Sequence, residues 1–325
     1  MPRILFVKTS SLGDVVHNCP AVTDAARLVP GAVIDWVVEE PFAEIAAFHA
    51  SVRRVIPVAI RRWRSSPFAA ATWSELGAFR AALRGERYDA VIDSQGLVKS
   101  ALVAKLALGR KHGFDRASAR EPFAARFYDA THAVPSSLHA VDRNRQLAAV
   151  VLGYRVDGPC DYGLRVAGEP PAELRALMPA AAPYALLFTM TSRADKLWPE
   201  ERWRSLGSAL QSRGLRCLLP WGTEAERDRC ARIADAIPGA LVPRRMTLAE
   251  IARLTRAAHC VVGVDTGLAH LAAALEVPVV GLYCGSDPAL TGVQGKGRFW
   301  NLGNSGRPPE VGEVLGALEA LGMPR

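Results

Sequence analysis

The chain has 325 residues, of which 50% are hydrophobic and 22% are charged. This composition excludes a disordered chain or a coiled coil, and at roughly 150 residues per domain the length indicates about two domains. The net charge of +8 favours acidic partners such as nucleic acid, phosphorylated metabolites or an anionic membrane surface.

Membrane insertion and export are not expected. The sequence has no apolar run of the ~18 residues that a bilayer-spanning helix needs, and its first residues do not form a signal peptide. The cysteines form no CxxC pair, and three of them lie inside apolar runs. This favours buried, reduced thiols over disulfides or a metal site. The cysteines are Cys19, Cys160, Cys217, Cys230, Cys260 and Cys284.

In the first half of the chain, short apolar runs alternate with longer helical patterns. Near-continuous apolar strands between helices indicate a parallel sheet covered on both faces. The predicted strands are residues 4–7, 34–38 and 90–92, and the predicted helices are about 15–28 and 98–108.

Residues 157–183 are rich in proline, glycine and alanine, which indicates an interdomain region. We predict a first domain at 1–165, a linker region at 166–183 with a short helix at 173–177, and a second domain at 184–325. The clusters of proline, glycine and alanine lie at 157–159, 168–171 and 179–183.

The alternation then restarts, which predicts a second α/β domain. Two such halves predict doubly wound, Rossmann-like domains facing a cleft, with ligands beyond the carboxyl ends of the strands. The last predicted helix is amphipathic and could pack back on the first domain. The predicted strands are 185–188, 217–219, 260–264 and 279–282, and the helices are 199–212, 225–236, 266–275 and 310–321.

The segment 8–14, Lys-Thr-Ser-Ser-Leu-Gly-Asp, lies between the first strand and the first helix. Gly13 permits tight backbone geometry, and Asp14 would project toward the cleft, where a carboxylate can take a proton from an attacking hydroxyl. An aspartate near a helix start is also a favoured cap, so spacing alone leaves both roles open.

The segment 264–270, Val-Asp-Thr-Gly-Leu-Ala-His, follows a strongly apolar strand and opens a helix. The free N–H groups at a helix start attract anions, and Thr266 adds a hydroxyl while Gly267 allows close approach. This pattern predicts a phosphate site with His270 one turn further along, although a capped helix with an incidental histidine is the alternative.

Two further segments of the second half carry weaker signals. Hydroxyls and Lys196 precede the helix that starts near 199 and could hold a pyrophosphate, although a solvated loop is an equal alternative. Glu226, after the next strand, loosely fits an acid that accepts hydrogen bonds from ribose hydroxyls, but a first-turn glutamate stabilised by the helix dipole is the simpler interpretation.

Arg61, Arg62 and Arg64 place three guanidinium groups within four residues. Such clusters suit capture of carboxylates or phosphates, although a basic surface loop is the commoner explanation. Nucleic acid is disfavoured because no recognised binding motif accompanies the charge. The same half also carries Lys111, His112, Arg120 and Arg143.

Several motifs are missing from the sequence. It has no DxD pair, no HxxxH or HxH spacing, no GxSxG elbow, and neither a GxGxxG nor a Walker loop at the first strand. We therefore expect no protein-bound metal.

Taken together, an ordered set of segments resembles the lipopolysaccharide heptosyltransferase I family. The resemblance covers about residues 1–295, and the last thirty residues carry no diagnostic motif. The set is specific, although each piece alone is weak. The segments are 7–15, 35–40, 56–64, 88–100, 195–201 and 264–270.

The resemblance implies a GT-B glycosyltransferase, with the acceptor on the first domain and the nucleotide-sugar on the second. It implies inverting transfer of L-glycero-D-manno-heptose from ADP-heptose to the inner Kdo of Kdo-lipid A. No cofactor is implied, because ADP-heptose is a substrate. Peripheral docking on the anionic cytoplasmic face of the inner membrane is expected, without nucleic acid as a partner.

The resemblance also implies roles for residues. Asp14 matches the general base, and Lys196 matches the residue that steadies the departing diphosphate. The implied donor-binding set adds Thr191, Ser192, Glu226, Met246, Asp265, Thr266, Gly267 and His270. The implied acceptor-binding set is Ser10, Ser11, Gly13, Arg61, Arg62, Arg64, Arg120 and Arg143.

Two alternatives stay open at this point. One is the second heptosyltransferase of the same family, which extends the first heptose. The other is a non-catalytic protein that binds a nucleotide-sugar, which would have no need of a base at position 14.

Overall fold

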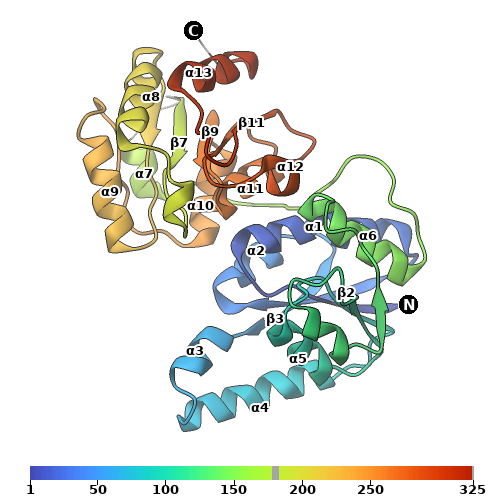
Figure 1. Ribbon diagram of the computed structural model, residues 1–325. Helices are drawn as coiled ribbons and strands as arrows, with labels where there is room; N and C mark the ends of the chain where they lie inside the picture. The colour runs from blue at the N-terminus through green and yellow to red at the C-terminus, as the bar shows by residue number, and fades with distance from the viewer. Residues whose placement is uncertain (178–182, 324–325) are drawn as a thin grey trace. The chain divides into compact units, whose positions relative to one another are not determined.

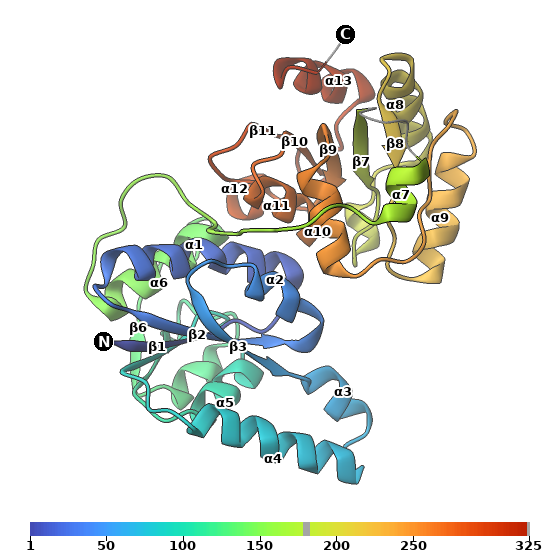
Figure 2. The same ribbon diagram turned by 180° about the vertical axis from the view of Figure 1, so that it is seen from behind.

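The computed structural model describes residues 1–177 and 183–323. The chain divides into two compact units, Met1–Arg165 and Val166–Arg325. Each unit is a parallel sheet with helices on both faces, so the predicted α/β fold class is confirmed (Figures 1 and 2). Residues 179–182 of the predicted proline- and alanine-rich run lie outside the described residues.

The first unit contains a six-stranded sheet with the strand order β3-β2-β1-β4-β5-β6. This is the order of a doubly wound dinucleotide-binding fold. The strands are β1 (Arg3–Val7), β2 (Val33–Glu39), β3 (Val52–Val58), β4 (Ala90–Asp93), β5 (Lys111–Phe114) and β6 (Ala130–His132). The helices are α1 (Leu12–Leu28), α2 (Ala43–Ala47), α3 (Ile60–Ser65), α4 (Ala70–Arg84), α5 (Val98–Leu106) and α6 (Ala140–Leu152), with 3-10 turns at Glu40–Phe42 and Pro122–Phe127.

The central strands of this sheet are buried on both faces. Ile4, Leu5, Phe6 and Val7 of β1 are fully buried, as expected for a strand between two helical layers. Helices α1 and α6 pack together on one face, and α4 and α5 cover the other (Figures 1 and 2).

The second unit contains a five-stranded sheet with the order β11-β10-β9-β7-β8. Its strands are β7 (Tyr184–Phe188), β8 (Arg216–Leu218), β9 (Cys260–Val264), β10 (Val279–Tyr283) and β11 (Phe299–Gly303). Its helices are α7 (Ala172–Leu177), α8 (Glu200–Ser212), α9 (Glu224–Ala234), α10 (Leu248–Arg256), α11 (Gly267–Ala274), α12 (Pro288–Thr291) and α13 (Val311–Ala320), with a 3-10 turn at Ala194–Lys196.

Two apolar clusters sandwich this second sheet. One joins its strands to α8, α9 and α13, and the other joins them to α10 and α11. Helix α13 therefore contributes Val314 and Leu318 to the core of its own unit. The expectation that it packs back on the first domain stays a prediction.

Each sheet has a point where the strand order reverses, and ligands of such folds bind there. In the first unit the reversal lies between β1 and β4, and in the second unit it lies between β7 and β9. The segments that follow these four strands therefore define the candidate sites.

The sequence did not predict every element. Strand β11 was missed because it is an edge strand without a continuous apolar run. Strands β3, β5 and β6 and helices α4, α6 and α10 were also missed. In the three strands, arginine or histidine interrupts the apolar run. Pro199 caps α8 and does not belong to its first turn.

The buried thiols that the sequence predicted are present in the structure. All six cysteines are buried and free. Among the described residues, no helix combines the length and the apolar character that crossing a bilayer requires.

Candidate active site

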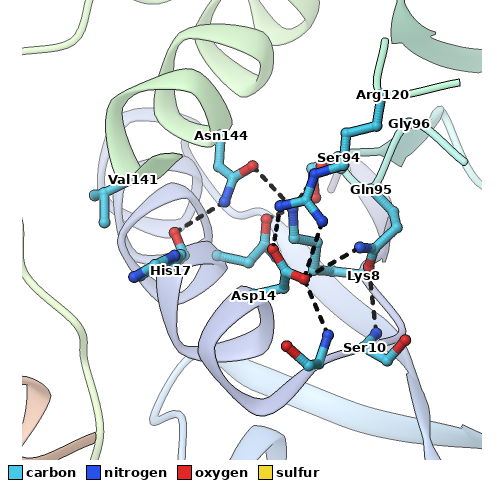
Figure 3. Close-up of polar contacts among 12 residues, drawn as sticks. Lys8, Ser10, Asp14, His17, Ser94, Gln95, Gly96, Arg120, Val141 and Asn144 are labelled. Carbon is cyan, nitrogen blue, oxygen red and sulfur yellow. Dashed lines mark hydrogen bonds and ion pairs between the residues drawn. The ribbon is translucent and has the colours of Figure 1, made fainter. Parts of the chain in front are cut away.

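Asp14 lies in the first turn of α1, directly beyond the carboxyl end of β1. Its Oδ2 accepts a hydrogen bond from the backbone N–H of Ser11 at 3.0 Å, so the carboxylate also caps the helix. The Arg120 guanidinium donates to Oδ1 at 2.6 Å and to Oδ2 at 3.2 Å (Figure 3). The side-chain amide of Gln95 lies 3.5 Å from Oδ2. The acid that sequence spacing singled out is thus part of a charged cluster.

The surroundings of Asp14 favour its ionised form. Burial by itself would raise the pKa of this carboxyl. The positive charges of Lys8 and Arg120 outweigh burial, as do hydrogen bonds from Arg120 and Ser11, and they hold the pKa of Asp14 below its usual value. The side chain is 13% exposed, so it is not enclosed in the core. An acceptor hydroxyl would therefore meet a carboxylate and not a carboxylic acid.

Lys8, the residue that follows β1, is buried beside this cluster. Its Nζ donates to the Ser94 carbonyl at 2.6 Å and to Asn144 Oδ1 at 3.2 Å. Burial lowers the pKa of Lys8 to about 8, and the charge of Asp14 opposes that shift. When protonated, the Lys8 ammonium places a positive charge in the wall of the cavity beside Asp14.

A small cavity opens onto these groups. Three basic side chains line it, one from the segment after β1, one from the loop after β5 and one from α6, so the cavity is suited to an anion. Its lining residues are Lys8, Ser94, Gln95, Phe114, Arg120, Ala140, Arg143 and Asn144.

Hydrogen bonds to buried side chains hold the loop after β4. Asp93 is fully buried, and its carboxylate accepts from the backbone N–H of Gln95 at 2.8 Å and from the Tyr128 hydroxyl at 2.8 Å. Gln95 Oε1 in turn accepts from the N–H groups of Thr9 and Ser10 at 3.1 and 3.2 Å. These bonds tie the segments after β1 and β4 together at the switch point.

The predicted acceptor residues divide into two groups. Arg143 lines the cavity, stacks over the Phe114 ring at 4.9 Å and donates to the Ser118 carbonyl, while Arg120 binds Asp14. Burial and the charge of Arg120 lower the pKa of Arg143. The structure thus brings Arg120 and Arg143 together with Asp14.

The arginines of α3 lie apart from this cavity. Arg62 pairs with Glu40 at 3.0 Å and with Glu75 at 2.8 Å, and the Arg61 guanidinium lies over the Phe42 ring at 5.8 Å. Arg64 is exposed. Because α3 follows β3, these side chains share the carboxyl edge of the sheet with Asp14, but no described hydrogen bond or ion pair joins them to it.

Ser10, Ser11 and Gly13 line the path from β1 into α1. The Ser10 hydroxyl accepts from Lys99 Nζ at 3.1 Å, and Ser11 is the residue that caps α1. Gly13 was expected to permit tight backbone geometry; it lies in α1 and is not among the glycines with positive φ.

Asp265 organises the switch point of the second unit. Its Oδ2 accepts from Lys196 Nζ at 2.6 Å and from the Ser286 hydroxyl at 2.6 Å, and its Oδ1 lies 3.6 Å from His270 Nε2. Burial would raise the pKa of Asp265, but hydrogen bonds from these three side chains hold that pKa well below its usual value. Lys196 is therefore fixed by Asp265 at the carboxyl end of β9.

Helix α11 starts beside this pair, and the predicted phosphate residues lie at its beginning. Thr266 is the residue that caps α11, and Gly267 is its first helical residue. Thr191, which follows β7, donates from its hydroxyl to the Asp265 carbonyl at 3.1 Å. Ser192 is exposed in the same loop. The positive end of the α11 dipole and the Lys196 ammonium thus lie at one switch point.

Two residues that were predicted to bind the nucleotide-sugar also make contacts within the protein. Glu226 Oε2 accepts from the backbone N–H groups of Gly222 at 2.7 Å and Thr223 at 3.1 Å, which closes a capping box at α9. Met246 is 9% exposed and packs with Leu186 and Ile251 in the apolar cluster under α10 and α11.

Sequence reasoning did not assign a site role to five polar residues here. Lys8, Ser94, Gln95 and Ser286 each follow a strand at a carboxyl end, so their position is a signal that could have found them. Asn144 lies on α6, more than 130 residues from Lys8, and nothing in the local sequence marks it. Within residues 1–177 and 183–323, no group of three or more metal-ligating side chains comes together.

Comparisons with known proteins agree with this geometry. The family model of glycosyltransferase family 9 (heptosyltransferase) matches residues 76–312. Lipopolysaccharide heptosyltransferase 1 of Escherichia coli strain K12 is 49% identical over 299 residues, which cover 91% of this chain and 92% of that protein. The Pseudomonas aeruginosa protein of the same name is 46% identical, over 90% of this chain and 82% of its own.

Solved structures show the same similarity. The structure of E. coli heptosyltransferase WaaC with ADP superposes with a TM-score of 0.86 at 44% identity, covering 98% of this chain and 99% of that chain. The same enzyme with ADP-2-deoxy-2-fluoro heptose gives a TM-score of 0.83 at 44% identity, over 98% of this chain and 99% of that chain. These similarities confirm the predicted GT-B class and the family resemblance.

Proposed function

This chain belongs to glycosyltransferase family 9, the heptosyltransferases, and we propose that it transfers L-glycero-D-manno-heptose from ADP-heptose to the inner Kdo sugar of Kdo-lipid A. The family and the similarity to heptosyltransferase 1 proteins support transfer from a nucleotide-sugar in lipopolysaccharide synthesis. One observation carries the proposal: an ionised carboxylate, Asp14, lies at a sheet switch point beside a cavity lined by cations.

Asp14 is the proposed general base. The acceptor oxygen attacks the anomeric carbon of heptose, its proton passes to the Asp14 carboxylate, and the bond to the diphosphate breaks as ADP departs with the electron pair. Attack from the face opposite the leaving group inverts the anomeric carbon. General-base assistance of this kind is typically worth ~10²–10⁴ in rate.

The Asp14–Arg120 pair sets a condition on this step. Arg120 contacts both carboxylate oxygens, so its guanidinium competes with an acceptor hydroxyl for Asp14. The acceptor carries carboxylates and phosphates, and an anion that draws Arg120 toward the cavity would free the base. The Arg120 side chain is 45% exposed, which leaves it room to do so.

Lys196 and the start of α11 are proposed to stabilise the departing ADP. Charge that develops on the diphosphate would meet the lysine ammonium and the positive end of the helix dipole. Thr191, Ser192, Thr266, Gly267 and His270 are the proposed remaining diphosphate contacts, with Asp265 near the heptose. Glu226 is the proposed ribose contact and Met246 the proposed adenine contact.

The acceptor is proposed to bind the first unit through Ser10, Ser11, Gly13, Arg61, Arg62, Arg64, Arg120 and Arg143. The enzyme is proposed to act without a cofactor or protein-bound metal, since a lysine and a helix start can balance the charge of the leaving group. We further propose a peripheral location on the cytoplasmic face of the inner membrane, because the acceptor is a lipid and the chain is basic.

Mass spectrometry of the acceptor tests this function. Kdo-lipid A and its singly heptosylated form would each be incubated with ADP-heptose and the protein. The proposal predicts a gain of one heptose on Kdo-lipid A and little on the other acceptor. A gain only on the heptosylated acceptor would assign the chain to the second transfer, and no gain on either would refute the proposed reaction.

A further inference from the structure

The segment that joins α3 to α4 exposes two large aromatic side chains. Phe68 is 93% exposed and Trp73 is 65% exposed, and among the large apolar side chains of the described residues only Met1 is as exposed as Phe68. Leaving such surface in water is unfavourable, so aromatic residues clustered within one segment commonly mark an interaction site. Figures 1 and 2 show α3 and the connection that follows it standing away from the sheet of their unit.

Helix α4 presents these groups in an ordered way. It buries Thr72, Phe79 and Leu83 on one side. Arg80 and Arg84 lie seven and eleven residues after Trp73, so the three side chains share one exposed stripe, which runs beside the buried one. The other exposed residues of α4 are alanine, serine and glycine, which keep this stripe low and accessible.

The same segment carries a strong positive charge. Residues 60–84 contain five arginines and one acid, Glu75. Glu75 is occupied by Arg62 and by the indole N–H of Trp63, at 2.8 and 2.7 Å. None of the remaining arginines forms an ion pair with a residue that the structure describes. These four are Arg61, Arg64, Arg80 and Arg84.

We propose that this α3–α4 surface, made of Arg61, Arg64, Phe68, Trp73, Arg80 and Arg84, docks the enzyme on an anionic phospholipid bilayer. Aromatic rings enter the interfacial zone of a bilayer, and arginine heads stay level with its anionic headgroups. A protein partner would need a shaped contact, whereas a short aromatic tip flanked by unpaired cations fits a fluid charged surface.

Three other exposed apolar residues, Phe123, Leu290 and Trp300, differ from Phe68 and Trp73 in their surroundings. Phe123 is covered in part by its own unit, since the Arg126 guanidinium lies 5.0 Å from its ring and Phe127 packs edge-on against it. Trp300 and Leu290, in the second unit, are 47% and 41% exposed but have no comparable run of arginines around them in sequence. They supply a matched control.

The inference rests on the proposed function, because it gives the enzyme a reason to sit at a membrane. Helix α3 follows β3 at the same carboxyl edge of the sheet as Asp14. A bilayer that contacts α3 and the start of α4 would therefore hold a membrane-bound acceptor on the side of the sheet where the base lies.

Vesicle flotation tests the surface directly. Wild type, Phe68→Ser/Trp73→Ser and the control Leu290→Ser/Trp300→Ser would be mixed with vesicles of phosphatidylglycerol and phosphatidylethanolamine, or of phosphatidylcholine alone. We expect wild type and control to float with the anionic vesicles, and the aromatic variant to partition roughly tenfold or more weakly, as the loss of two inserted rings implies. Arg80→Gln/Arg84→Gln should weaken binding chiefly at low salt.

Activity assays separate this inference from the proposed function. The aromatic variant should keep wild-type turnover on a deacylated, soluble acceptor and lose turnover on acceptor held in vesicles. If it floats with anionic vesicles as wild type does, the surface is refuted even if transfer occurs. If it floats normally on vesicles without acceptor yet loses turnover on the acylated acceptor, the segment binds the acceptor's own acyl chains, and the bilayer proposal is again refuted. If no transfer is seen, the function fails while flotation still tests the surface.

Discussion

The two units place a carboxylate at the same kind of switch point and hold it in different ways. The Asp14 carboxylate forms an ion pair with the Arg120 guanidinium, and the Arg120 side chain is 45% exposed. Asp265 receives Lys196 and Ser286, and both the acid and its histidine neighbour are buried. Both carboxyls have a lowered pKa, so the pKa does not tell them apart.

What separates them is whether the partner can leave. Arg120 lines a cavity suited to an anion, so an incoming anion can compete for it. The Asp265 side chain is 7% exposed and its partner Lys196 is 18% exposed, less than half the exposure of Arg120. We infer that the first acid is reactive and that the second fixes a lysine in place for the leaving group.

Removing Lys196 should give the largest loss among the variants that leave Asp14 intact. Lys196→Met keeps the bulk of the side chain but removes the charge that faces the diphosphate, so kcat with saturating ADP-heptose should fall about 10²–10³-fold. Steady-state kinetics with thermal melting in parallel would measure this. Arg232→Gln, an exposed ion-pair change on α9, is the control and should leave kcat unaltered. A Lys196→Met rate equal to wild type would remove the lysine from the mechanism.

Arg120→Met tests whether the base is masked in the free enzyme. Loss of the guanidinium removes a charge and hydrogen bonds that lower the pKa of Asp14, so that pKa should rise toward or above its ordinary value of about 3.9. Because kcat/KM reports ionisations of the free enzyme, the acid limb of its pH profile should move to higher pH in the variant. The KM for the acceptor should rise as well. An exposed neighbour, Arg116→Met, should leave the limb in place. An unmoved limb in Arg120→Met would contradict the pairing.

The lowered pKa of Lys8 predicts that kcat/KM for the acceptor falls at alkaline pH. Since its pKa is lowered to about 8, it loses its charge as the pH rises through that value, and the cavity becomes less attractive to an anion. We expect kcat/KM for the acceptor to decline above about pH 8, roughly tenfold per pH unit for one essential proton. A pH profile of Lys8→Met should lack this limb while starting from a lower plateau. A limb that persists unchanged in the variant would assign it to another group.

Ser286→Ala should have the smallest effect. Asp265 keeps Lys196 and loses one neutral hydrogen bond, which is worth about 0.5–1.5 kcal/mol, so kcat should fall only about two- to tenfold. A loss as large as that of Lys196→Met would mean that the hydroxyl itself contacts the substrate.

The sequence predicted the features that local pattern controls. The apolar runs of β1, β7 and β9 marked buried parallel strands, and the turns after β1 and β9 marked Asp14 and the start of α11. Edge elements such as β3 and β11 escaped prediction because half-exposed strands carry no continuous apolar signal.

The pairing of the site residues could not be predicted, because it depends on contacts far apart in the chain. Arg120 lies 106 residues from Asp14, and Lys196 lies 69 residues from Asp265. Family resemblance supplied these names as candidates, but only the folded geometry shows that each acid already holds a cation.

The single-turnover rate of Asp14→Asn, with ADP-heptose and acceptor both bound, tests the central claim most directly. Asparagine keeps the size and polarity of the side chain but cannot take the acceptor's proton. We predict a rate at least about a hundredfold below wild type with an unchanged dissociation constant for ADP-heptose. A rate close to wild type with both substrates bound would contradict the assignment of Asp14 as the base.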